Sequence, residues 1–233
     1  MSEDECVHVL GCADCRRRTD AEVAVLRWGV AAADEFGYAA PSREWATATV
    51  ERLRPAVVTT ILSGVARGDV ELVGPRFRLP SLGGAKGPYA WFSRSARGVP
   101  APNWEYFVQV ATWLQIRDEV PSDVDVGFED DLMDVTVRVD GAVVWCVEVK
   151  ERAAQLQPLL HRMLEHGRHV DLDSPDRSDD PLRKAKYVVR HRPRWFSLVA
   201  GDAWSDHGVE PVGDHGFVLR PATRDDVLRS LAA

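Results

Sequence analysis

The sequence predicts an α/β protein in which helices flank a mixed β-sheet, preceded by a small helical domain. Three observations lead to this fold class. Residues 21–80 have three helical patterns and then a short hairpin, and residues 81–102 are rich in Gly, Pro, Ser and Ala. From residue 103 onward the order is helix, three strands, helix, strand, strand. The chain has 233 residues, 45% of them apolar, which is enough for one large core or two small ones.

The first domain is predicted over 21–80. Apolar residues at helical spacing span 21–36, and Gly37 then ends that helix. Ser42 begins a second helix that runs to about Arg54, and Pro55 begins a third that reaches Gly68. Residues 70–79 form two short strands around a Gly-Pro turn. This order, and the ending ARGDVELVGPRFRLP, resembles the winged helix-turn-helix family, which implies DNA binding.

The second domain is predicted over 103–233, after a basic linker at 81–102. Asn103 caps a helix that Pro121 ends, and LMDVTVRVDGAVVWCVEVKE forms two strands joined by Asp140-Gly141, a preferred pair for a tight hairpin turn. The remaining elements are a strand over 124–128, helices over 153–166 and 181–191, strands over 195–200 and 217–219, and a short C-terminal helix.

The net charge of −7 is unevenly distributed along the chain. Residues 101–140 contain ten acidic and two basic side chains, and strongly basic stretches lie on both sides. Such a layout suits cations at the centre and polyanions at the edges. No apolar run approaches the roughly 18 to 20 residues of a membrane helix, and the N-terminus is acidic where a signal peptide is basic. We expect a soluble, cytoplasmic protein with no membrane association.

Three charged residues on the two arms of the hairpin suggest chemistry. Glu148 and Lys150 are two apart on a strand and therefore project to one face, where Asp134 on the paired strand can join them. An ionised Glu between Val147 and Val149 needs a partner or a metal to offset its desolvation. A divalent cation would meet that need.

These residues, over about 103–200, resemble the PD-(D/E)xK nuclease superfamily, whose fold is restriction-endonuclease-like. The resemblance implies that Glu105, Asp134 and Glu148 hold Mg²⁺ or Mn²⁺ and that Lys150 orients or activates the attacking water. Met133 stands where the family has proline. Other acids lie near enough to compete for the role of Asp134: Asp123, Asp125, Asp130 and Asp131. Family members often have a polar residue on the following helix, for which Gln155 and Gln157 are candidates.

Basic residues near the hairpins and in PLRKAKYVVRHRPRW suit contact with a phosphate backbone. The predicted set is Arg76, Arg78, Lys86, Arg183, Lys184, Lys186, Arg190, Arg192 and Arg194. Aromatic residues lie among the basic residues of 76–97 and suit base stacking. The alternatives are a solvated helix face and an adaptable linker.

The N-terminal segment, residues 1–20, contains a candidate structural zinc site. Its four ligands would be Cys6, His8, Cys12 and Cys15, two of them in C-x-x-C spacing. The alternative is a tail of reduced thiols without metal.

Together these features predict a Mg²⁺-dependent endonuclease that hydrolyses DNA, in phage defence, restriction or repair. We expect a homodimer, because cutting both strands of a duplex usually needs two sites. Two alternatives remain: a non-catalytic DNA-binding or regulatory protein on a nuclease-like scaffold, and a nuclease subunit of a larger complex.

Overall fold

The computed structural model describes residues 13–82, 87–130, 132–175, 180–201 and 203–231. The chain divides into two compact units, residues 1–107 and 108–233, and the division falls within one helix, α4 (Trp104–Glu119). The structure contains α-helices and a six-stranded mixed sheet, so the predicted α/β class is confirmed. Within the described residues, no helix is both long and apolar enough to cross a membrane.

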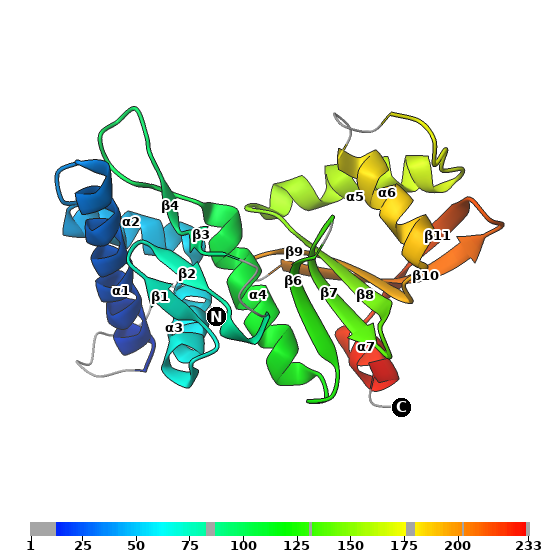
Figure 1. Ribbon diagram of the computed structural model, residues 1–233, viewed down its shortest axis with the longest axis horizontal. Coiled ribbons are helices and arrows are strands. Elements are labelled where there is room, and N and C mark those ends of the chain that lie inside the picture. The colour runs from blue at the N-terminus through cyan, green and yellow to red at the C-terminus, as the bar shows by residue number, and fades with distance from the viewer. Residues whose placement is uncertain (1–12, 83–86, 131, 176–179, 202, 232–233) are drawn as a thin grey trace, which may run out of the picture. The chain divides into compact units, whose positions relative to one another are not determined.

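The first unit begins with three helices and continues into short strands (Figure 1). The helices are α1 (Ala13–Phe36), α2 (Arg43–Leu53) and α3 (Pro55–Arg67). As predicted, Ser42 caps α2, since its Oγ accepts a hydrogen bond from the Trp45 amide at 3.3 Å, and Pro55 occupies the first turn of α3. Helix α1 begins eight residues before the predicted start at Ala21.

Strands β1 (Glu71–Val73) and β2 (Arg76–Arg78) form the predicted hairpin, and β3 (Tyr89–Ala90) pairs antiparallel with β2. A one-turn 3-10 helix, η1 (Pro80–Leu82), follows β2, and β4 (Phe92–Ser93) pairs with β5 (Ala101–Pro102). The segment 81–102, predicted to be a linker, therefore belongs to the first unit and supplies the third strand of its sheet.

An aromatic stack forms the core of the first unit. The Trp91 ring lies 4.1 Å from Phe77, 4.6 Å from Phe107 and 5.6 Å from Trp28, measured between centroids. Trp91 and Phe92 are both buried, so these two aromatics are not surfaces on which a base can stack. Their burial, and not flexibility, explains the presence of large aromatics in a Gly- and Pro-rich segment.

The second unit is built on one six-stranded sheet in the order β11-β10-β9-β8-β7-β6. The strands are β6 (Asp125–Asp130), β7 (Met133–Val139), β8 (Ala142–Val149), β9 (Trp195–Ala200), β10 (Ala203–Val212) and β11 (Gly216–Ala222). Strands β8 and β9 are parallel and every other neighbouring pair is antiparallel, so the sheet is mixed as predicted. Asp140 and Gly141, both with positive φ, make the expected turn between β7 and β8.

The sequence does not predict strand β10, which lies between the two expected strands at 195–200 and 217–219. Its residues, AWSDHGVEPV, lack the apolar alternation of a half-buried strand. Hydrogen bonding to β9 on one side and β11 on the other stabilises it, and both are tertiary contacts. The last strand is also longer than the predicted 217–219 for the same reason.

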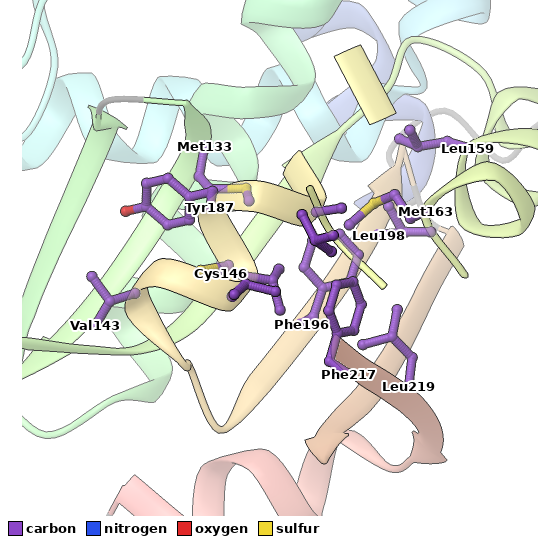
Figure 2. Packing of buried hydrophobic residues seen from close by; sticks show 14 of the residues in the cluster. Met133, Val143, Cys146, Leu159, Met163, Tyr187, Phe196, Leu198, Phe217 and Leu219 are labelled. Carbon is purple, nitrogen blue, oxygen red and sulfur yellow. The ribbon is translucent and has the colours of Figure 1, made fainter. Parts of the chain in front are cut away.

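Helices α5 (Leu156–Gly167) and α6 (Asp180–His191) cover one face of this sheet (Figure 1). A 3-10 turn, η2 (Ala153–Gln155), precedes α5 where a continuous helix from residue 153 was predicted. Figure 2 shows the side chains that fill the space between these helices and the strands, among them Met163, Phe196, Leu198 and Phe217.

Helices α4 and α7 (Arg224–Leu231) pack on the other face. The Trp113 ring of α4 contacts Phe128 edge-on, and the Arg224 guanidinium of α7 lies 4.3 Å above the Trp145 ring. The charged residues of β7 and β8 can therefore face α6 while the opposite face of each strand is packed.

Candidate functional site

Asp134, Glu148 and Lys150 come together where β7 begins and β8 ends. Val135 pairs with Val147 across these strands, so the residues next to this pair, Asp134 and Glu148, lie side by side. One Asp134 carboxylate oxygen accepts a hydrogen bond from the Val149 amide at 2.6 Å. The two-residue period of a strand, which predicts that these residues project together, agrees with the structure.

Glu148 is fully buried and each of its carboxylate oxygens faces an ammonium group. Its Oε1 lies 2.6 Å from Lys150 Nζ, and its Oε2 lies 2.5 Å from Lys184 Nζ. Lys150 follows β8, with 20% of its side chain exposed, whereas only 8% of the Lys184 side chain is exposed. Two carboxyl groups, of Asp134 and Glu148, and two ammonium groups, of Lys150 and Lys184, thus lie close together in a largely buried region.

Two groups of the cluster, Asp134 and Lys184, have pKa values shifted by their surroundings. Burial, and next the repulsion from Glu148, raise the pKa of Asp134 well above its usual range; Lys184, the Val149 amide and Lys150 offset only part of this. Burial alone would lower the pKa of Lys184, but the attraction of Glu148 and Asp134 outweighs it and the pKa is raised. The lysines therefore do not fully offset the burial of Asp134, whose carboxyl group still favours a proton or a bound cation.

Lys184 belongs to this site, although the sequence predicts it to bind nucleic acid. It lies in α6, buried beside Glu148. The signal available in the sequence was helical spacing, which puts Lys184 on one helix face with the apolar residues Pro181 and Val188. The expected helix-borne partners are elsewhere: Gln157 is exposed, and the exposed Gln155 accepts a hydrogen bond from the Arg152 amide.

Helix α4 reaches the same strand through Gln109. This buried amide donates to the Asp134 backbone carbonyl at 3.0 Å and to a Glu129 carboxylate oxygen at 2.9 Å. Glu105, the predicted metal ligand one turn earlier, is exposed in the first turn of α4 and belongs to the first unit.

The structure separates Asp134 from the other acids proposed for its role. Asp130 is bound by Thr136 at 2.7 Å and by Arg138 at 2.8 Å, and Asp123 and Asp125 are exposed. Asp131 lies outside the described residues. Within the part of the chain that the structure describes, no group of three or more Asp, Glu, His or Cys side chains is arranged to hold a metal ion. Asp134 and Glu148 are thus two oxygen donors without a third carboxylate in that group.

Two carboxylates of this kind still fit Mg²⁺ or Mn²⁺. These ions prefer hard oxygen ligands, and Mg²⁺ commonly keeps several waters and takes only one or two protein carboxylates. Burial, and next the charge of Glu148, raise the pKa of Asp134, and a bound cation would favour its ionised form against both effects.

The predicted nucleic-acid-binding residues fall into three groups. Arg78, Arg190, Arg192 and Arg194 are exposed, and Arg183 is half-buried. Arg76 is engaged with Glu35 through two hydrogen bonds of 2.5 and 2.7 Å. Lys184 and Lys186 are buried, and the Lys186 ammonium donates to the Ser174 carbonyl, so neither offers its charge to a phosphate. Lys86 lies outside the described residues.

The exposed arginines after α6 lie at the end of β8 opposite to Glu148. The Arg194 amide donates to the carbonyl of Val144, four residues before Glu148 on β8. At about 3.3 Å per strand residue, this separates them by roughly 13 Å along the strand. A polyanion held by both regions would have to span at least this distance.

The predicted zinc site lies mostly outside the described residues. Cys6, His8 and Cys12 are in the undescribed N-terminal segment, and Cys15 is half-buried in α1.

Comparison of the chain with protein-family models, with curated proteins and with solved structures finds no match in any of the three.

Proposed function

We propose that this chain is a metal-dependent nuclease that hydrolyses phosphodiester bonds of DNA. The observation that carries the proposal is the convergence of Asp134, Glu148 and Lys150 at the ends of two paired strands. The order α4, β6, β7, β8, α5, α6, β9, with β9 parallel to β8, supports it. The PD-(D/E)xK resemblance implies a helix, a strand hairpin that carries Asp and then Glu-x-Lys, and a further helix and strand.

Asp134 and Glu148 would hold the metal in this proposal. A bound Mg²⁺ or Mn²⁺ would lower the pKa of a coordinated water and stabilise the negative charge that develops on the phosphate. The Val149 amide fixes one oxygen of Asp134, and Glu148 is held in the sheet by β7 and β9. Neither carboxylate therefore needs to reorganise much to bind a cation.

Lys150 would act on the water and the phosphate. Its ammonium is partly exposed at the end of β8, while its backbone amide donates to the Val199 carbonyl at 2.7 Å and so fixes its main chain. A positively charged donor there can orient an attacking water or contact a phosphate oxygen. We also propose Glu105 as a third carboxylate ligand of the metal.

In this proposal the exposed arginines contact the DNA. In the first unit, Arg78 extends from β2, whereas α3 carries one basic residue, Arg67, which binds Asp69 at 2.7 Å. In the DNA binding that the winged-helix resemblance implies, the β1–β2 hairpin would therefore contribute more of the contact than α3. A role in phage defence, restriction or repair and a homodimer belong to the same proposal.

The test is cleavage of plasmid DNA and of labelled single- and double-stranded oligonucleotides, with Mg²⁺, with Mn²⁺ and with EDTA. We expect metal-dependent cutting that Glu148→Gln and Lys150→Met abolish and that Arg220→Ala, an exposed change on β11, leaves intact. Glu105→Gln tests the third carboxylate in the same assay.

Binding of DNA without cutting by the wild-type chain under every condition, with unchanged binding by Glu148→Gln and Lys150→Met, would overturn the catalytic proposal. A DNA-binding protein on a nuclease-like scaffold would then be favoured. Cutting that appears only when a partner protein is added would identify a subunit of a larger complex.

A further inference from the structure

Lys184 is enclosed by hydrogen-bond acceptors at the candidate site. Its ammonium donates to the Leu132 carbonyl at 2.6 Å and lies 2.5 Å from Glu148 Oε2, with Asp180 at 3.9 Å on the same helix. Its side chain is 8% exposed. A lysine held in this way by a strand and by its own helix has no freedom to reach a substrate.

The two lysines on Glu148 differ in how deeply they are buried. Lys184 is buried in α6, where its ammonium also donates to the Leu132 carbonyl. Lys150 stands at the end of β8 and is more than twice as exposed. Moving Lys184 away would leave a carbonyl and a carboxylate oxygen buried without it, which is costly, whereas Lys150 can turn toward water.

Charge limits what else the cluster can hold. Asp134 and Glu148 carry two negative charges when ionised, and the two lysines carry two positive charges. One divalent ion brings the total to +2, which the departure of the Lys150 ammonium toward water or phosphate reduces. A second divalent ion would need another carboxylate oxygen and would add two more charges in a buried region.

We propose that Lys184 is a positioning residue that permanently holds Glu148 Oε2 and thereby restricts the site to one divalent cation. The ion would then bind through Asp134 and Glu148 Oε1 and displace the Lys150 ammonium from that oxygen. This inference rests on the proposed metal-dependent function and deepens it, because Lys184 takes the place that a second metal ion would occupy.

The experiment is a Mn²⁺ titration of the full chain, with bound metal counted by electron paramagnetic resonance and affinity measured by calorimetry. Lys184→Met removes the ammonium with little change in side-chain length, Lys184→Gln keeps a donor for Leu132, and Lys184→Arg keeps the charge. Folding of each variant is checked first by circular dichroism and thermal unfolding.

We expect one Mn²⁺ per wild-type chain and the same count for Lys184→Arg. A neutral variant should bind a second Mn²⁺, or bind the first at least tenfold more tightly. If Lys184→Met does not fold, Lys184→Gln provides the comparison.

Two Mn²⁺ ions in the wild-type chain, or a folded neutral variant with unchanged count and affinity, would overturn the role of Lys184 and leave metal-dependent cleavage standing. An absence of Mn²⁺ binding by the wild type, together with no cleavage, would overturn the proposed function as well. The count of bound metal thus separates the two failures.

Discussion

Breaking the buried ion pair between Glu148 and Lys184 should destabilise the second unit severely. Glu148→Met leaves the Lys184 ammonium buried with the Leu132 carbonyl as its closest partner, since the carboxylate at 2.5 Å is gone. Removing one partner of a buried pair costs about 3–5 kcal/mol. Lys184→Met should cost less, about 1–3 kcal/mol, because Lys150 at 2.6 Å still compensates Glu148.

These values convert to a change in melting temperature. The second unit, residues 108–233, has about 126 residues, and an unfolding entropy near 2.1 cal/mol/K per residue gives about 0.26 kcal/mol/K. A loss of about 3–5 kcal/mol therefore lowers the melting temperature of this unit by about 11–19 °C. Changes of this size are large against the usual marginal stability of a domain.

The assay is urea unfolding of the wild type, Glu148→Met, Lys184→Met and the double variant, followed by tryptophan fluorescence. The double variant should be more stable than the sum of the single losses predicts, by at least about 2 kcal/mol, because two apolar side chains replace a desolvated pair. Single losses below about 1 kcal/mol that add without coupling would refute the reasoning. The same data show whether Glu148 variants are folded enough to be judged in a cleavage assay.

Three further predictions concern packing, pH and thiol chemistry. Gly29→Ala should destabilise the first unit by about 1–3 kcal/mol in urea unfolding, because the new Cβ would lie 2.6 Å from the Trp45 ring. Adding Trp45→Leu should recover part of this loss, and a double variant without any recovery would argue against the contact. Burial lowers the pKa of His207 below 6.5, so the unfolded chain binds the proton first as the pH falls, and stability should be lost below about pH 6.5. In His207→Gln the unfolding free energy should depend less steeply on pH, and an equal dependence in both proteins would contradict this. Burial also raises the pKa of the Cys146 thiol, so Cys146 should not react with a thiol reagent until the chain unfolds. The assay uses a chain whose three N-terminal cysteines are replaced by serine, and fast labelling of the native protein would show that β8 is accessible.

The sequence alone determined the local elements and the hairpin that carries the carboxylates. Ser42 and Pro55 mark helix starts because capping and the fixed φ of proline are properties of a few neighbouring residues. Asp140-Gly141 fixes the turn and register of β7 and β8 in the same local way, and the register brings Asp134 next to Glu148. These parts of the candidate site could be predicted because strand geometry has a period of two.

Only the tertiary structure decided what surrounds that hairpin. The burial of Lys184, the hydrogen bonds of Gln109 and the presence of strand β10 depend on residues distant in sequence. A basic run reads alike whether its lysines face water or a buried carboxylate, because the sequence shows charge but not burial. Burial sets the energy of a charged group and is known only once α6 has packed on the sheet, so the fourth charged residue of the site emerged only from the fold.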